Sequence, residues 1–311
     1  MSEKVVLGTR GSDLALAQAR LVTEALCERW ADVEIEKRII RTSGDEGQGL
    51  LPPVDLRAGR KGLFTAEIER ALVAGEIDLA VHSAKDLPSD LNPLTEIAAA
   101  LPRAMTGDVL ISAEPYDLLS LPQGGVVATG SVRRSHQLRW KRPDLKVVDL
   151  RGNVPTRLHK LASSEWHAII LAQAGLQRLG LGEAAEGGMA CEGRRFNMAM
   201  LSRDVFLPAG GQGVIAVQIR ADDDRVRLLL ESINHFDTRL CLRAERQFLR
   251  LLQADCNQPI GVLAEIEGSS MNLRGQIFQP EAITPREAVV DGPSEDAEAL
   301  AAQLFSLIHE N

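Results

Sequence analysis

The stretch that decides the fold is IDLAVHSAKDLP, residues 77–88. Apolar residues alternate with Asp and Ala at its start, which predicts a strand. Pro88 cannot continue a helix and favours an extended residue before it. We therefore expect His82, Ser83, Lys85 and Asp86 just past the carboxyl end of a strand, where open α/β sheets bind ligands. Lys85 and Asp86 would provide a cation and an acid/base group, although a solvated loop with an incidental charge pair is the alternative.

The composition limits the classes of function. The chain has 311 residues, of which 45% are hydrophobic, and a formal net charge of −8. This predicts two or three domains with substantial cores and argues against general nucleic-acid binding. The sequence has no apolar run long enough to span a bilayer and no amino-terminal cleavage pattern. We expect a cytoplasmic monomer with neither nucleic-acid nor membrane partners.

The cysteines point to neither disulfides nor metal. Four of them, Cys27, Cys191, Cys241 and Cys256, are too few for a disulfide framework in a chain this long. Neither CxxC nor HExxH spacing occurs, so we predict no metal site. Cys27 and Cys241 lie in helical patterns and are expected to be small core residues.

The first hundred residues alternate strands with helices. Lys4–Thr9 and Val33–Ile40 are predicted strands, and Ser12 is a good N-cap for the helix between them. Thr42–Lys61 is rich in glycine, proline and charge without periodicity, which predicts a lid or mobile segment. A helix predicted over residues 64–74 leads into the opening strand.

A second alternation begins near Ala104 and changes character after residue 220. The predicted strands are residues 109–112, 126–128, 146–150, 168–171 and 214–219. This alternation predicts parallel sheets with crossover helices, with residues 182–202 as a loop. The last third is predicted to segregate two helices, three short antiparallel strands and a closing helix, which is typical of a small α+β domain.

Arginine recurs where a strand runs into a short polar turn and a helix. The residues are Arg10, Arg133, Arg134, Arg151 and Arg157. A cation in the first turn opposes the helix dipole, so this placement makes sense if an anion binds there, since the helix end supplies N–H donors and guanidinium a bidentate fork. The alternative is that these arginines point into solvent. The repetition favours a polyanionic ligand, and carboxylates fit better than phosphate because no Walker A sequence is present.

Eight motifs carry a resemblance to a known family. They are TRGSDLAL (9–16), GRKGLF (59–64), AVHSAKDLP (80–88), GSVRRSHQL (130–138), RGNVPTRL (151–158), AIILAQAGLQRLGL (168–181), LPAGGQG (207–213) and CNQPIG (256–261). In this order they closely resemble the hydroxymethylbilane synthase, or porphobilinogen deaminase, family. The resemblance covers nearly the whole chain and is weakest after Gly261.

The resemblance implies an α/β fold of three domains. Two doubly wound domains similar to type II periplasmic binding proteins, residues 1–102 with 205–219 and residues 103–204, would hold the active site between them. A small α+β domain, residues 220–311, would carry a cofactor cysteine. The implied transferase joins four porphobilinogen molecules head to tail, releases ammonia at each step, and releases hydroxymethylbilane by hydrolysis. A covalently attached dipyrromethane cofactor would prime the chain.

The resemblance also implies roles for individual residues. Asp86 matches the catalytic aspartate and Cys256 the cofactor-attachment cysteine, and a thiol is a soft nucleophile suited to an electrophilic carbon. The residues implied to bind the cofactor are Arg10, Ser12, Ser83, Lys85, Thr129, Ser131, Arg133, Arg134, Arg151 and Arg157. Those implied to bind substrate are Arg10, Lys61, Phe64, Arg151, Arg157 and Arg178. The arginines suit this chemistry because each porphobilinogen adds an acetate and a propionate.

The sequence departs from the family pattern beside the attachment cysteine. Ala254 and Asp255 stand where the family commonly has two glycines, which changes the backbone freedom and the charge near the thiol. Two other functions compete with the transferase: a non-enzymatic, type II periplasmic-binding-like module for a polycarboxylate anion, and a phosphate-handling enzyme. The anion-binding module would have no use for Cys256, and the phosphate enzyme lacks a phosphate loop.

Overall fold

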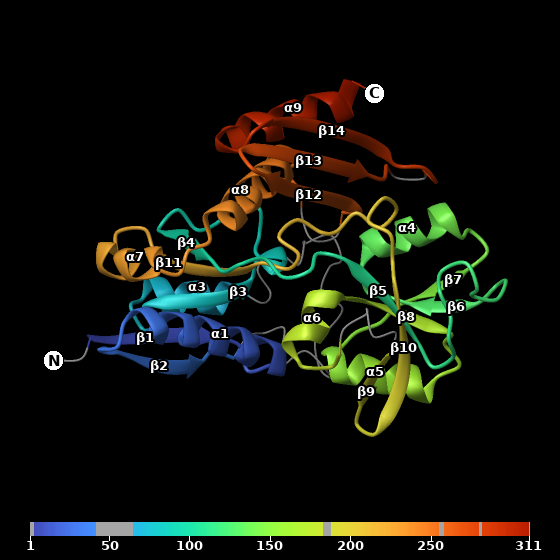
Figure 1. Cartoon of the computed structure of the whole chain (residues 1–311), viewed down its shortest axis with the longest axis horizontal. Helices are drawn as coiled ribbons and strands as arrows, with labels where there is room; N and C mark the ends of the chain where they lie inside the picture. Colours follow the sequence, from blue (N-terminus) through green and yellow to red (C-terminus); the bar gives the residue numbers. More distant parts are fainter. Residues whose placement is uncertain (1–2, 42–64, 183–187, 255–257, 280–281, 311) are drawn as a thin grey trace.

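Three β-sheets, each with its own helices, make up the fold (Figure 1). The computed structural model describes residues 3–41, 65–182, 188–254, 258–279 and 282–310. Within these ranges no helix is long and apolar enough to cross a membrane. The segment predicted to be a lid, Thr42–Lys61, lies outside the described residues, as do Phe64 and Cys256.

The first sheet has five strands in the order β2-β1-β3-β11-β4. β11 runs antiparallel to its neighbours β3 and β4, whereas β1 is parallel to β2 and β3. Helices α1 and α7 share one apolar core with this sheet, and α3 packs with Ile77 and Ala80 in another. The strands are β1 (Glu3–Thr9), β2 (Val33–Ile39), β3 (Leu79–Ser83), β4 (Thr95–Ala100) and β11 (Ile215–Arg220), and the helices are α1 (Asp13–Arg29), α3 (Ala66–Val73) and α7 (Asp224–Glu231).

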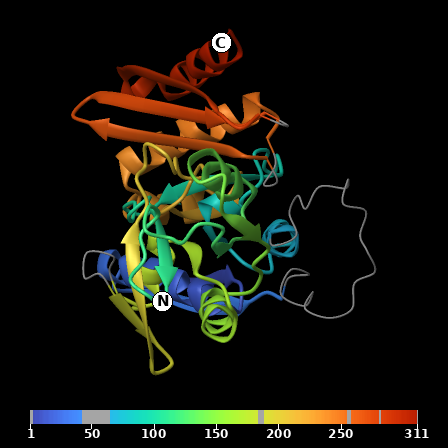
Figure 2. The ribbon, with the colours of Figure 1, turned by 90° about the vertical axis from the view of Figure 1, so that its right-hand side faces the viewer.

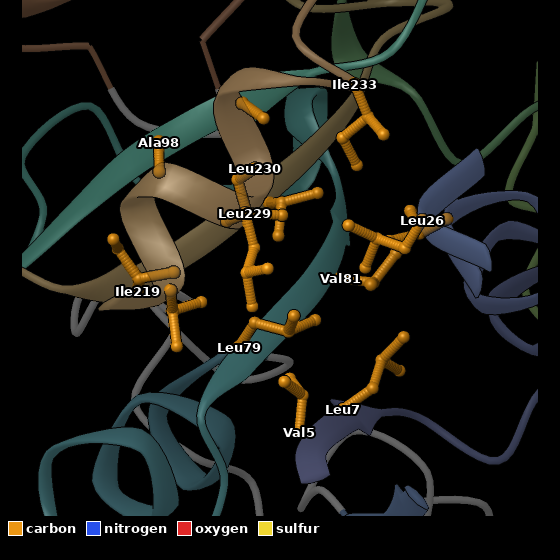
Figure 3. Close-up of a cluster of buried hydrophobic side chains, with 14 of the residues drawn as sticks. Val5, Leu7, Leu26, Leu79, Val81, Ala98, Ile219, Leu229, Leu230 and Ile233 are labelled. Atoms are coloured by element: carbon orange, nitrogen blue, oxygen red, sulfur yellow. The ribbon is translucent and has the colours of Figure 1, made fainter. Parts of the chain in front are cut away.

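Alternation along β3 separates these two cores. Leu79 and Val81 point into the core shared with α1 and α7, together with Leu7, Leu26 and Leu230 (Figure 3). Ala80, one residue out of phase, belongs to the core under α3. The period of two therefore buries both faces of the strand and leaves its carboxyl end to carry polar side chains.

The second sheet has six strands in the order β7-β6-β8-β5-β10-β9. β6 is parallel to β7 and β8, and the other pairings are antiparallel. One core contains side chains of α5 and α6, and the other contains Leu138 of α4. The elements are β5 (Asp108–Ser112), β6 (Val126–Ala128), α4 (Val132–Lys141), β7 (Lys146–Val148), α5 (Val154–Ser163), β8 (Ala168–Ala172), α6 (Gln173–Arg178), β9 (Gly188–Cys191) and β10 (Arg194–Met200).

The third sheet is a small antiparallel meander that packs against α8 and α9 around Phe248, Leu273 and Leu304. Its elements are α8 (Phe236–Leu251), β12 (Ile260–Glu267), β13 (Ser270–Ile277), β14 (Arg286–Pro293) and α9 (Ala297–Glu310). Figure 2 shows this layer stacked on the other two. The predicted fold class, doubly wound α/β with a small α+β carboxyl-terminal part, is confirmed.

The structure corrects several local predictions. Residues 182–202, predicted as a loop, contain the antiparallel hairpin of β9 and β10. The sheets are mixed rather than parallel, and β4 was not predicted because its TEIAAA sequence lacks a clear alternation. Cys27 is exposed rather than a core residue, whereas Cys241 is buried as expected. Helix α7 contributes Val226, Leu229 and Leu230 to the core of the first sheet.

Two chain crossovers connect the first and second sheets, and they bond to each other. The Ala104 amide donates to Gly213 O at 3.0 Å, and Gln212 Nε2 donates to Thr106 O at 2.7 Å. Gly213 has a φ of +85°, and a Cβ at this position would lie 2.5 Å from Ala104 O. Only glycine tolerates both the left-handed conformation and this close approach.

We expect Gly213→Ala to lower the free energy of unfolding by about 3 kcal/mol, because backbone strain adds to a backbone clash. Gly180→Ala is the matched control, since Gly180 has a φ of +66° with no atom within 4 Å of an added Cβ. The control should lose only about 1 kcal/mol. Urea denaturation measures both values, and equal losses would show that the crossover contact is not tight.

Candidate active site

The turn after β3 brings the predicted catalytic residues to a cavity. Ser83 ends β3, and residues Ala84–Asp86 form a single 3₁₀ turn that Leu87 and Pro88 terminate in an extended conformation. The Asp86 side chain is exposed. It lines a cavity of about 60 Å³ together with Arg10, Ser12, Leu14, Ala15, Gln18, Thr65, Val81, His82 and Ser83. The predicted clustering at the carboxyl end of this strand is therefore observed, with the difference that His82 and Ser83 belong to the strand itself.

The amino terminus of α1 forms another wall of this cavity. Ser12 is its N-cap, and the Ser12 hydroxyl accepts a hydrogen bond from the Ala15 amide at 3.3 Å. One turn further on, Gln18 is buried, and its Nε2 donates to Ser83 Oγ at 2.8 Å. Gln18 was not predicted as a site residue, because a glutamine in an amphipathic helix gives no signal of its own. The bond fixes the end of β3 against α1.

Lys85 faces a second cavity between the first and second sheets. This cavity of about 20 Å³ is also lined by Ser83, Gly175, Arg178 and Gly211. Burial lowers the pKa of Lys85 to about 8, and the adjacent Asp86 opposes the shift. Arg178 donates to Gly213 O at 2.6 Å, and burial lowers its pKa to about 10. Both groups remain predominantly cationic at neutral pH, so two cations from different sheets face one space.

Arg133 and Arg134 are buried on a shared carboxylate rather than pointing into solvent. Arg134 binds Asp108 through Nε at 3.1 Å and Nη2 at 2.7 Å, and Arg133 Nη2 donates to Asp108 Oδ2 at 2.9 Å. All three residues are at most 5% exposed. The two guanidinium groups hold the pKa of Asp108 well below its usual range, although burial opposes them. One carboxylate for two arginines leaves an excess of one positive charge.

Asp108 also connects this arginine pair to the crossover. Gln212 Nε2 donates to Asp108 Oδ1 at 2.8 Å, and Gln212 itself is 1% exposed. Arg133 Nε is buried and has no hydrogen-bond partner within the described part of the chain. Neither Asp108 nor Gln212 was predicted, because nothing in the sequence shows that residues 25 positions before Arg133 and 79 after it converge on it.

The turns before α4 and α5 supply the remaining predicted residues. Thr129 Oγ1 accepts from the Ser131 amide, and Ser131 Oγ caps α4 at the Arg134 amide. Arg151 is exposed and pairs with Asp149 at 2.9 Å. Gly130 brings the two turns together, since a Cβ there would lie 2.4 Å from Leu150 O and 3.5 Å from the Arg151 guanidinium.

Arg157 lies in the first turn of α5. Its Nε donates to Gly152 O at 2.7 Å. Burial, followed by repulsion from Arg134 and Arg151, lowers its pKa to about 10, and Asp86 opposes this shift. Arg157 is therefore electrostatically coupled to residues of both sheets.

The charge balance of the site fits a polycarboxylate. Five cations, Arg10, Lys85, Arg151, Arg157 and Arg178, accompany the buried pair on Asp108, against the carboxylates of Asp86 and Asp149. The chain as a whole carries a net charge of −8, so this positive region is local. Several arginines and a lysine around these cavities are the donor set that a ligand with several carboxylates would satisfy.

Comparison with known proteins identifies the family of this chain. Residues 5–228 match the family model described as "Porphobilinogen deaminase, dipyromethane cofactor binding domain", and residues 239–309 match "Porphobilinogen deaminase, C-terminal domain". The chain belongs to the porphobilinogen deaminase family. The porphobilinogen deaminase of Nitrobacter hamburgensis is 45% identical over 306 residues, which are 98% of this chain and 92% of that protein. That of Syntrophomonas wolfei is 46% identical over 271 residues, 87% of this chain and 84% of that protein.

Among solved structures, the VFT2 domain of Bordetella pertussis BvgS matches 74% of this chain over 85% of its own length, with a TM-score of 0.41 and 16% sequence identity.

Family membership confirms the predicted activity. The enzyme is a porphobilinogen-polymerising transferase of tetrapyrrole biosynthesis, with a dipyrromethane cofactor and porphobilinogen as substrate. The alternative of a non-enzymatic anion-binding module is not favoured.

We expect Asp108→Asn to lower the free energy of unfolding by about 3–5 kcal/mol, because it leaves two buried guanidinium groups without a counter-charge. Asp149→Asn is the control. It removes the carboxylate of an ion pair whose side chains are 54% and 61% exposed, and it should cost about 0–1 kcal/mol. Chemical denaturation at neutral pH measures both, and a small loss for Asp108→Asn would mean that the arginines find another partner.

Proposed function

We propose that Asp86 is the catalytic carboxylate of this porphobilinogen deaminase. The observation that carries the proposal is its place: an exposed carboxylate on the wall of a cavity that Arg10 also lines, with Lys85 beside it. Loss of ammonia from porphobilinogen leaves a cation whose charge spreads toward the pyrrole nitrogen. A fixed carboxylate beside that nitrogen stabilises the charge and can accept or return a proton.

The cations have a separate role in the proposal. Arg10, Arg151, Arg157, Arg178 and Lys85 neutralise the acetate and propionate groups of substrate and cofactor, and the buried pair Arg133 and Arg134 contributes its one excess charge. Lys61 and Phe64, outside the described residues, are proposed to contact substrate. Ser12, Ser83, Thr129 and Ser131 are proposed as polar cofactor contacts, although three of these hydroxyls already serve as helix caps or turn acceptors.

Cys256 is the proposed attachment residue for the dipyrromethane cofactor. When bound, the cofactor supplies the pyrrole ring to which substrate units are added. Cys256 lies outside the described residues, but its neighbour Ala254 is buried, and Ala254 O accepts from Ser89 Oγ at 3.1 Å. Arg246 of α8 donates to the carbonyls of Pro88 and Ser89 at 2.8 and 3.0 Å. These bonds hold Ala254 and α8 against the loop that follows Asp86.

The proposal extends to the surroundings of the enzyme. We propose that it acts as a monomer in the cytoplasm without nucleic-acid or membrane partners. The net charge of −8 supports the absence of nucleic-acid and membrane partners, because it disfavours binding to nucleic acids and to anionic lipid surfaces.

We expect Asp86→Asn to reduce kcat by about 10²–10⁴-fold with the cofactor still bound, since the amide keeps the size but cannot exchange a proton or balance a cation. Asp90→Asn, at an exposed aspartate four residues further on, is the matched control and should retain full turnover. Steady-state formation of the tetrapyrrole product and intact-protein mass report the two quantities. Turnover of Asp86→Asn within threefold of wild type would remove Asp86 from the mechanism.

We expect Cys256→Ser to be purified without a stable covalent cofactor and with little activity, because the hydroxyl is a far weaker nucleophile than a thiolate. Cys191→Ser, in the hairpin of the second sheet, should keep the added mass of two pyrrole units. Peptide mapping of the wild type should find that mass on the peptide that contains Cys256. A modified Cys191, or an unmodified Cys256 in fully active protein, would contradict the assignment.

A further inference from the structure

Two polar groups in the cavity beside Asp86 have no partner. Thr65 is 2% exposed and His82 is 5% exposed, and both line the cavity that Asp86 and Arg10 also line. Thr65 Oγ1 and His82 Nε2 are buried, and neither has a hydrogen-bond partner within the described part of the chain. Leaving such a group unsatisfied costs about 1–3 kcal/mol, so two of them on one cavity indicate that a ligand completes their bonding.

The positions of both residues are fixed by the fold. His82 lies in β3 opposite Ala216 of β11, one residue before the Ser83 that Gln18 holds. Thr65 is the N-cap of α3, but its side chain makes no capping bond. A threonine hydroxyl at this position usually accepts from the helix backbone, so here it keeps its donor and acceptor capacity for something else.

The charge around these groups selects the kind of ligand. Arg10 lines the same cavity, and the amino termini of both α1 and α3 meet there through Ser12 and Thr65. A cation and two helix amino termini favour an anion. The pKa of His82 is lowered to about 4, mainly by burial and further by Arg10 and Arg246, while the side chain of Gln218 opposes the shift. His82 is therefore neutral at physiological pH and can donate one N–H bond from Nε2 without adding another charge.

We propose that Thr65 and His82 are substrate-binding residues that donate hydrogen bonds to a carboxylate of porphobilinogen beside Arg10. This rests on the proposed function, in which arginines neutralise the substrate carboxylates. Arg10 supplies the charge, whereas Thr65 and His82 supply direction, because two neutral donors with fixed positions accept a carboxylate only in one orientation. Asp86 on the same wall would then face the remainder of the pyrrole rather than its carboxylate.

The test combines side-chain variants with substrate analogues. Thr65→Val removes only the hydroxyl, His82→Leu removes the ring donor, and His82→Gln keeps an N–H donor. Each is assayed as the purified holoenzyme with porphobilinogen and with two analogues, in which either the acetate or the propionate is replaced by an uncharged alkyl group. Thr23→Val is the matched control, since the Thr23 hydroxyl bonds to Ala19 O within α1 and does not line the cavity.

We expect Thr65→Val and His82→Leu each to raise KM for porphobilinogen about tenfold, with kcat changed less, and His82→Gln to recover most of the loss. The penalty should vanish with the analogue that lacks the bound carboxylate and persist with the other, which also tells the acetate from the propionate. Thr23→Val should behave as wild type with all three substrates.

An equal penalty on all three substrates would assign Thr65 and His82 a purely structural role, and no penalty on any would remove them from binding; either result overturns the proposal. Asp86→Asn separates this failure from that of the proposed function. Its loss of kcat should extend to every analogue whether or not Thr65 and His82 discriminate among them.

Discussion

The structure depends most on one buried carboxylate, that of Asp108. Two guanidinium groups removed from water would cost several kcal/mol each if they had no counter-charge. Asp108 makes their burial possible by accepting from Arg133 and Arg134 together, and the carbonyls of Leu207 and Ile170 take further donors. Because all these bonds are directional, the first turn of α4 has one position relative to β5. The position of α4 in turn sets the positions of the turns that carry Thr129 and Arg151.

The same network reaches the turn that carries Asp86 through the crossover at residues 211–213. Gln212 bonds to Asp108, while a Cβ on Gly211 would lie 3.0 Å from the backbone of Ala84 and Lys85. The Gly211 amide donates to Glu245 Oε2 at 2.6 Å, and Glu245 also pairs with Arg103 of the other crossover at 2.7 Å. Gln212 thus contacts Asp108, which holds the arginine pair of the second sheet, and Gly211 contacts both the Asp86 turn of the first sheet and α8 of the third. Closely packed junctions transmit displacement rather than absorb it.

Sequence patterns predicted the structural features that depend on neighbouring residues, but not those that depend on contacts between residues far apart in the chain. The strand before the Asp86 turn and the cap at Ser12 follow from short-range rules, and the family motifs brought together Asp86, Lys85 and Arg10. Asp108 lies outside the motifs and Gln212 was not singled out within LPAGGQG, because the function of each comes from burial beside partners far along the chain. The hairpin of β9 and β10 was not predicted, because the glycines and methionines in its sequence obscure the alternation of apolar and polar residues. The sequence predicts that the arginines bind an anionic ligand or point into solvent, whereas Arg133 and Arg134 bind the protein's own Asp108.

The free-energy cost of burying the arginines in the site affects how the site binds an anionic ligand. Arg157 and Arg178 have pKa values near 10, lowered mainly by burial, which means that their charged forms are less well solvated than in water. They stay charged at neutral pH, so the protein carries this unfavourable desolvation before any ligand arrives. A carboxylate that binds beside either arginine would relieve it. Each added pyrrole unit brings two carboxylates, and a site with several partly desolvated cations can accommodate them in succession without a new pocket for each.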